Sequence, residues 1–173
     1  FIVKTFVLFA TGFLFATGSS MDTLDRTDRR ILDSLQRDGR LTQVDLAERV
    51  GLSPTAASER VKRLQRDGFL TGYRATLNPH RLGRGLLVFV EVLLDRTTPD
   101  VFDLFATAVQ KAPDVLECHM VAGGFDYLLK TRVADMAAYR GFLGEVVAHF
   151  PGVRETRTYV VMEEVKSDGF LPL

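Results

Sequence analysis

The chain has 173 residues, of which 46% are hydrophobic and 25% charged, and its formal net charge is zero. This length allows one large domain or two small ones, and the composition is that of a globular protein. The single cysteine, Cys118, excludes an intrachain disulfide framework, and the three histidines show no metal-ligand spacing with it. We therefore expect a reducing, cytoplasmic location, no cofactor and no structural metal.

The first 20 residues differ from the rest of the chain, because they are apolar and aromatic with one charge, at Lys4. Their hydrophobic run from Phe6 to Ala16 is short for a membrane span and close to a signal-peptide core. A charged, soluble pattern begins only after Met21, the first methionine. We interpret residues 1–20 as a non-native or upstream-translated extension; a secretion signal is the second alternative and a membrane anchor the third.

Three helices are expected next. The first covers residues 25–36, the second begins after Thr42, and the third begins after Ser53. Thr42 caps the second helix and Gly51 supplies the left-handed residue that ends it. Ser53 caps the third helix, with Pro54 at its first position, and Gly68 ends it with Phe69 packed back on the helix. The apolar residues at helical spacing are expected to form the core: Ile31, Leu32, Leu35, Leu46, Ala47, Val50, Ala57, Val61 and Leu64.

The outer side of the third helix carries the candidate DNA-binding residues. Ser53, Pro54 and Thr55 would place the start of a helix in the major groove, where Ser58 and Glu59 would reach base edges. Four cations would mainly hold phosphates: Arg60, Lys62, Arg63 and Arg66. An ordinary solvated helix hairpin is the alternative. The agreement of caps, turn glycine, proline and basic flank on one geometry favours a helix-turn-helix.

The segment Phe69–Leu77 alternates enough to predict a small β-wing with Gly72 at its turn, from which Arg74 would touch the DNA backbone. Residues 81–85 are expected to form a hinge between domains. Residues 22–83 carry 12 Lys and Arg against 9 Asp and Glu, whereas residues 84–173 carry 9 against 13. This asymmetry is typical of a DNA-reading half joined to one that does not read DNA.

The C-terminal half alternates between strand and helix patterns. Strands are predicted over 86–94, 115–121, 125–133 and 154–165, and helices over 100–112 and 135–150. The middle two strands would be joined by a tight turn at Gly123-Gly124. This βαββαβ order predicts a ferredoxin-like antiparallel sheet with both helices on one face. The uncovered face would carry many apolar groups, which predicts a dimer formed by sheet pairing.

The faces of these two helices are also predicted from helical spacing. The residues expected to face inward on the first are Val101, Leu104, Phe105, Ala108 and Val109. Those expected to face inward on the second are Met136, Tyr139, Leu143, Val146, Val147 and Phe150. Cys118 and His119 are expected to be adjacent strand residues that point to opposite faces, and not a catalytic dyad.

Several stretches carry a resemblance that covers residues 24–166. They are the run LDRTD from Leu24, then GRLTQVDLAERVGLSPTAASERVKRLQRDGFLTGYRATLNPHRLG, and later LLVFVEVLLDR, VAGGFDYLLKTRV and TRTYVVMEEVK. Together they resemble the Lrp/AsnC family of prokaryotic transcription regulators, and its leucine-responsive branch in particular. The helix-turn-helix alone would be a weak identifier. Its pairing with this C-terminal half makes the resemblance specific.

The resemblance implies that the C-terminal half senses an amino acid and assembles the protein. The matching positions are Met120, Gly123, Gly124, Asp126, Tyr127, Met136, Tyr159, Val160 and Val161. Asp126 would accept a hydrogen bond from the ammonium group, and N–H groups at the glycines would hold the carboxylate. Met120, Met136 and the valines would line an apolar wall. The branch typically carries an acidic residue where this chain has Gly124, so the effector stays open.

Each of these positions has a structural alternative, in which the glycines form only a turn, Asp126 caps it and Met136 belongs to the core. No phosphate loop, nucleophile elbow or metalloprotease motif is present, so an enzyme is not expected. We predict an α+β protein with a winged helix-turn-helix domain over 21–80, a ferredoxin-like domain over 86–166 and a tail over 167–173.

Its predicted function is that of a transcription regulator that binds double-stranded DNA and responds to leucine or another aliphatic amino acid. The partners implied by the resemblance are a second copy of the chain in a homodimer and further copies in an octamer. No membrane partner is expected, and the expected location is the nucleoid in the cytoplasm. A stand-alone sensing or protein-interaction module is the alternative function.

Overall fold

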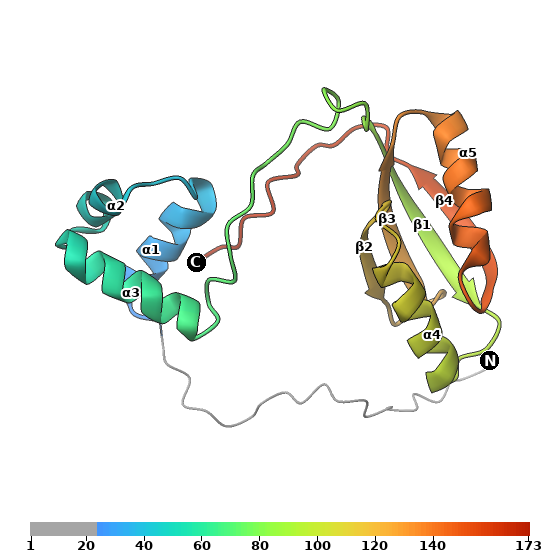
Figure 1. Ribbon diagram of the computed structural model, residues 1–173, viewed down its shortest axis with the longest axis horizontal. Helices are drawn as coiled ribbons and strands as arrows, with labels where there is room; N and C mark the ends of the chain where they lie inside the picture. The colour runs from blue at the N-terminus through green and yellow to red at the C-terminus, as the bar shows by residue number, and fades with distance from the viewer. Residues whose placement is uncertain (1–23) are drawn as a thin grey trace. The chain divides into compact units, whose positions relative to one another are not determined.

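The computed structural model describes residues 24–173, and the extension expected over residues 1–20 lies outside them. The described chain forms two compact units (Figure 1). One consists of residues up to Arg74 together with Gly169–Leu173, and the other is Ala75–Asp168. Among residues 24–173, no helix combines the length and the apolar character that crossing a membrane requires.

The first unit is built from three helices, α1 (Arg26–Arg37), α2 (Gln43–Val50) and α3 (Pro54–Arg66). All nine apolar residues predicted for its core are buried, with exposed fractions from 0% to 8%. The predicted caps are also confirmed, since Thr42 and Ser53 accept hydrogen bonds from the N–H groups of Asp45 and Ala56. Gly51 ends α2 with a φ of 72°, a conformation that glycine adopts without steric cost.

Two predictions at the end of α3 are wrong. Leu70, and not Phe69, packs back on the core, and its N–H donates to the carbonyl of Leu64 while Phe69 stays 44% exposed. The β-wing predicted over Phe69–Leu77 is also absent, because residues 70–78 form neither helix nor strand. A two-stranded ribbon is marginal unless another element covers it, and alternation alone does not supply that cover.

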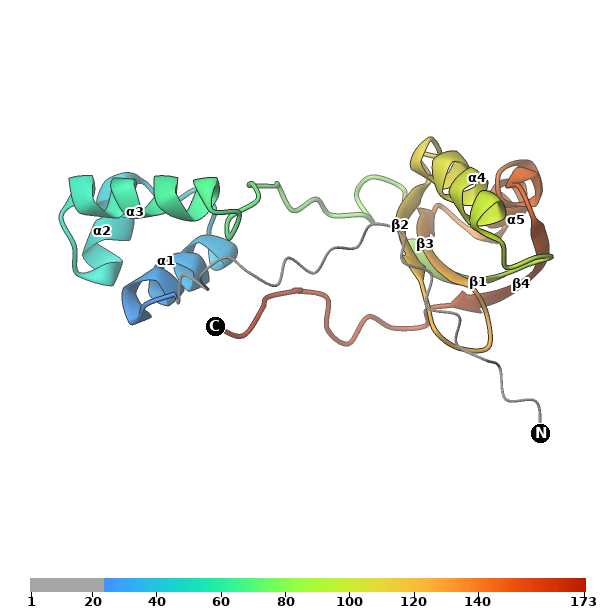
Figure 2. The same cartoon turned by 90° about the horizontal axis from the view of Figure 1, so that it is seen from below.

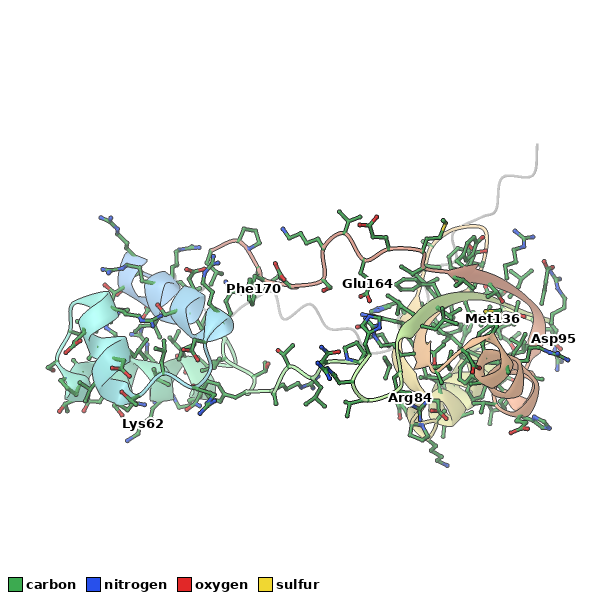
Figure 3. All side chains as sticks on the ribbon, turned by 90° about the horizontal axis from the view of Figure 1, so that it is seen from above. Lys62, Arg84, Asp95, Met136, Glu164 and Phe170 are labelled. Carbon is green, nitrogen blue, oxygen red and sulfur yellow. The ribbon has the colours of Figure 1, made fainter. Side chains whose placement is uncertain are left out.

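Residues of the C-terminal tail complete the first unit by packing against the end of α1. The Gln36 amide donates to the carbonyl oxygen of Leu171 at 2.9 Å and accepts from its N–H at 3.0 Å. The Arg37 guanidinium lies 5.5 Å from the centre of the Phe170 ring, a cation–π distance. Figure 3 labels Phe170 on this part of the chain.

The second unit has the predicted βαββαβ order. Its elements are β1 (Leu86–Leu94), α4 (Pro99–Gln110), β2 (Val115–Met120), β3 (Tyr127–Val133), α5 (Met136–Glu145), the 3₁₀ turn η1 (Val147–His149) and β4 (Val153–Val160). The strands pair antiparallel in the order β2-β3-β1-β4. Figure 2 shows α4 and α5 over the same face of the sheet.

The core of this unit lies between that face and the helices. Val88, Val90 and Val92 alternate inward along β1 and are fully buried, as the period of two in a strand requires. Phe105 of α4 is also fully buried, with its ring centre 4.4 Å from that of Tyr127 and 5.6 Å from that of Phe150. These aromatic contacts fix α4 on the sheet.

The helix faces of the second unit were predicted less well. Leu104 and Met136 are 57% and 48% exposed, although both were expected to face inward. The buried stripe of α4 runs through Val101, Phe105 and Val109, and Leu104 lies about 100° from its centre at 3.6 residues per turn. On α5 the buried residue that sequence reasoning missed is Phe142, which is 6% exposed.

Two elements end earlier than predicted. The helix expected over 135–150 stops at Glu145, where the Val146 N–H makes its last hydrogen bond to the carbonyl of Phe142, and the chain continues as η1. The strand expected to reach Val165 stops at Val160, which pairs with Val88 two residues from the start of β1 at Leu86. After one more backbone hydrogen bond, from the Val161 N–H to Leu87, the chain leaves the sheet. Met162 and Val165 are accordingly 99% and 89% exposed.

The open face of the sheet is more polar than predicted. The apolar side chains Phe89, Leu93 and Leu128 occupy it, but the charged Glu91 and Lys130 share the same side of the register. Mixed surfaces of this kind occur at interfaces as well as on free surfaces. The face therefore permits pairing with a second sheet without requiring it.

Replacement of Phe105 by alanine is expected to lower the free energy of unfolding by about 3–5 kcal/mol, because it empties a fully buried ring site. The adjacent Leu104→Ala is the control and should change it by less than about 0.5 kcal/mol. Urea unfolding followed by circular dichroism measures both. Equal losses would contradict the described face of α4.

Candidate DNA-binding and effector sites

The side of α3 opposite the core presents a row of four exposed residues. Their spacing of 4, 3 and 4 places them on one face of the helix, directly away from Ala57, Val61 and Leu64. The row consists of Thr55, Glu59, Lys62 and Arg66. Figure 3 shows Lys62 on the outer side of the helical unit. An exposed row with two cations on a short helix suits insertion into a DNA groove.

The other residues predicted at this surface hold different positions. The hydroxyl of Ser53 accepts the N–H of Ala56, so it organises the helix start instead of facing outward freely. Pro54 is exposed at the first position of α3, and Ser58 is half-buried on one flank of the row. Arg74 is exposed in the segment that follows α3.

Two of the four predicted phosphate-binding cations are engaged inside the domain. Nη1 of Arg60 donates to Oδ1 of Asp28 at 2.9 Å, and Nη2 of Arg63 donates to its Oδ2 at 2.6 Å. Arg60 also pairs with Asp25, the N-cap of α1. The Asp28 side chain is only 3% exposed. Sequence reasoning missed Asp28, because nothing in a lone aspartate indicates that two arginines 32 and 35 residues away will cover it.

These contacts shift the acid–base behaviour of the partners. The hydrogen bond from Arg60 lowers the pKa of Asp25 below its ordinary value, and the N–H of Asp28 lowers it further. The hydrogen bonds that Arg60 donates, first to Asp25 and then to Asp28, raise the pKa of Arg60. Arg60 and Asp25 are therefore charged at neutral pH and attract each other.

The candidate effector loop connects β2 to β3 through residues 121–126, and it is longer than the tight turn predicted. Gly123 and Gly124 are exposed, neither has a positive φ, and a Cβ added at either would meet no atom within 4 Å. Asp126 fixes the end of the loop. Its N–H donates to the carbonyl of Val92, and its Oδ2 accepts the N–H of Leu94 at 2.8 Å.

Tyr127 belongs to the core and not to this surface. It is 4% exposed, and its burial raises the pKa of the phenol to about 12. Cys118, on the same side of the sheet, is half-buried, and burial raises the pKa of its thiol to about 11. The thiol is therefore protonated at neutral pH and is a poor nucleophile. His119 points to the opposite face, as predicted, and its ring contacts Glu117.

The remaining predicted effector residues do not meet within one chain. Met120 and the glycine loop lie at the end of the sheet where β3 begins. Val160 and Val161 lie at the other end, where Val160 pairs with Val88 and the Val161 N–H reaches Leu87. The two groups could contribute to one pocket only if more than one chain supplied them.

The end of the sheet with Met120 and the glycines also carries charged groups that sequence reasoning did not single out. A shallow hollow beside Gly124 is lined by Glu91, Leu93, Phe125, Glu155 and Arg157. Glu155 and Arg157 form an ion pair at 3.0 Å. At the other end, Met136 and Val160 are 48% and 40% exposed. Tyr159, 49% exposed on β4, has a raised phenol pKa because its hydroxyl is hydrogen-bonded to Glu91.

The sequence matches two domain families that fit this architecture. Residues 24–71 match the winged helix-turn-helix DNA-binding domain, and residues 87–171 match the Lrp/AsnC ligand binding domain. The chain belongs to the Lrp/AsnC family. It is a DNA-binding transcription regulator that responds to an amino acid, and it is not an enzyme.

Relatives in this family match most of the chain. The leucine-responsive regulatory proteins of Escherichia coli K12 and Serratia marcescens are both 62% identical over 148 residues, which cover 86% of this chain and 90% of theirs. Among solved structures, a Neisseria meningitidis transcriptional regulator in complex with L-Met has a TM-score of 0.83 at 39% identity, over 87% of this chain and 97% of that one. An AsnC family regulator from Agrobacterium tumefaciens has a TM-score of 0.81 at 34% identity, over 86% and 96%.

Replacement of Asp126 by alanine is expected to lower the free energy of unfolding by about 1–3 kcal/mol, because the buried N–H of Leu94 loses its acceptor. Urea unfolding measures this loss. Asp103→Ala on the exposed side of α4 removes an equal charge and should have little effect. Equal stability of wild type and Asp126→Ala would show that the hydrogen bond from Leu94 to Asp126 does not stabilise the fold.

Proposed function

We propose that α3 enters the DNA major groove and reads it with the exposed row Thr55, Glu59, Lys62 and Arg66. The observation that carries this proposal is the position of the row directly opposite the buried stripe of α3. Thr55, Ser58 and Glu59 would contact base edges, while Lys62 and Arg66 would hold phosphates. Ser53 and Pro54 position the helix start, and Arg74 would add a backbone contact.

Lys62→Ala is expected to weaken binding to every duplex and to flatten the slope of log K against log salt by about one unit, because one phosphate contact is lost. Fluorescence anisotropy over a salt series measures this. Lys111→Ala, which removes the same charge from the exposed end of α4, is the control and should leave the slope unchanged. An unchanged slope for Lys62→Ala would remove this side chain from the interface.

The effector is proposed to be leucine or another aliphatic amino acid, bound near the loop 121–126. Two relatives support this: the E. coli protein is named leucine-responsive, and the Neisseria regulator is in complex with L-Met. Asp126 has one oxygen, Oδ1, for which no hydrogen-bond partner is found among residues 24–173, so it could accept from an ammonium group. The apolar side chain would contact Met120, or Met136 and the valines from another copy.

This division of the candidate residues supports assembly. We propose a homodimer paired through the open face of the sheet, and an octamer in which copies bring the two ends of their sheets together. An amino acid would then change assembly or DNA affinity only if it bound one of the two states more tightly. We also propose that the protein acts at the nucleoid in the cytoplasm.

Isothermal titration calorimetry with leucine, methionine and alanine is expected to show binding of at least one aliphatic amino acid. Gly124→Asp should change the affinity for this amino acid several-fold, because it adds a carboxylate to the loop that is proposed to hold the ligand. The new side chain fits there, since a Cβ at Gly124 meets no atom within 4 Å. Gly144→Asp adds the same charge on α5, also in open space, and is the control. No heat of binding with any amino acid at millimolar concentration would contradict the proposed effector site.

A further inference from the structure

Four charged side chains form a compact cluster where the first turn of α1 meets the flank of α3. They are Asp25 and Asp28 from α1, and Arg60 and Arg63 from α3. Asp28 is one of two polar residues buried in the described chain, the other being Thr131. The N–H of Asp28 donates to Asp25 at 2.7 Å, so the capping box of α1 holds both carboxylates in place.

The cluster is electrically balanced, with two carboxylates against two guanidinium groups. It therefore compensates half of the four cations that α3 carries. Lys62 and Arg66 stay on the outer row, where the Arg66 side chain is 73% exposed although it pairs with the neighbouring Asp67. The arginines remain partly accessible, with 31% of the Arg60 side chain and 44% of the Arg63 side chain exposed. They are close to the proposed DNA-facing row, but their charge is compensated from within the domain.

We propose that Asp28, assisted by Asp25, restrains Arg60 and Arg63 and so limits the sequence-independent part of DNA binding. This inference rests on the proposed insertion of α3 into DNA. Each cation that reaches a phosphate strengthens binding to all sequences alike and adds about one unit to the salt slope. Specificity is the ratio of affinities for the right and wrong sequences. Two arginines held by Asp28 therefore leave more of the affinity to base contacts.

A purely structural role is the competing explanation, and it predicts different behaviour. A buried ion pair adds little net stability, because desolvation offsets much of the attraction. If Asp28 served only packing, its removal would change stability and leave the salt dependence of DNA binding as it is. If it restrains the arginines, its removal changes the number of phosphate contacts in the folded protein.

The test uses Asp28→Asn, which keeps the shape of the side chain and one acceptor oxygen but removes the charge. Binding is measured by anisotropy over a salt series, with a duplex selected by the protein from a random-sequence pool and with a scrambled copy of it. The slope is expected to steepen by about one to two units. Affinity for the scrambled duplex should rise about tenfold at low salt, more than affinity for the selected one.

Asp33→Asn is the matched control, since Asp33 lies on the same helix, is paired with an arginine and is 42% exposed. Its slope should match wild type. A double-mutant cycle adds a second readout. Arg63→Ala alone should barely change the slope, whereas Arg63→Ala combined with Asp28→Asn should lower it by about one unit relative to Asp28→Asn.

Asp25→Asn keeps a good N-cap and removes one of the two carboxylates that hold Arg60, while Asp28 still pairs with it. This variant carries the test if Asp28→Asn does not fold. It should steepen the slope by up to about one unit. An unchanged slope in a folded variant would overturn the inference and leave these carboxylates with a structural role alone, and a flatter slope would overturn it as well. Failure of the wild type to bind any duplex would instead overturn the proposed function itself.

Discussion

Burial of one apolar stripe on α3 determines most of what the first unit can do. Ala57, Val61 and Leu64 must face the core, and the fixed period of the helix then decides where every other side chain of α3 points. Lys62 and Arg66 are turned directly outward, while Arg60 and Arg63 are turned toward α1. The packing of three small helices thus selects the cations that are available to a partner.

Local sequence signals predicted the first unit well, because caps and helical stripes depend on residues only a few positions apart. Thr42, Gly51 and Ser53 are examples. The errors concern interactions that no short window contains. The predicted wing has no element to cover it. The inward position of Met136 was predicted from spacing along a helix of 135–150, but α5 ends at Glu145. The partners of Asp28 come from a helix 32 or more residues away. The βαββαβ order could be predicted, whereas the polarity of the open face depends on register.

The candidate effector site also depends on interactions that no short stretch of sequence contains. The resemblance assigned its residues to one site, but the strand register places Met120 and Val160 at opposite ends of the sheet in a single chain. Asp126 serves the fold through Leu94 and still has an oxygen to offer. If several copies complete the site as proposed, ligand binding would be coupled to assembly, because each copy would contribute only a part of the site.

The contact between Gln36 and Leu171 has a consequence for how the protein is made, since these residues are 135 positions apart. At a synthesis rate of about 5–20 residues per second, roughly 7–27 s pass between their appearance on the ribosome. The helices of the first unit can fold early, but the tail reaches them only after the whole sheet domain has been translated. The unit that is begun first is therefore completed last.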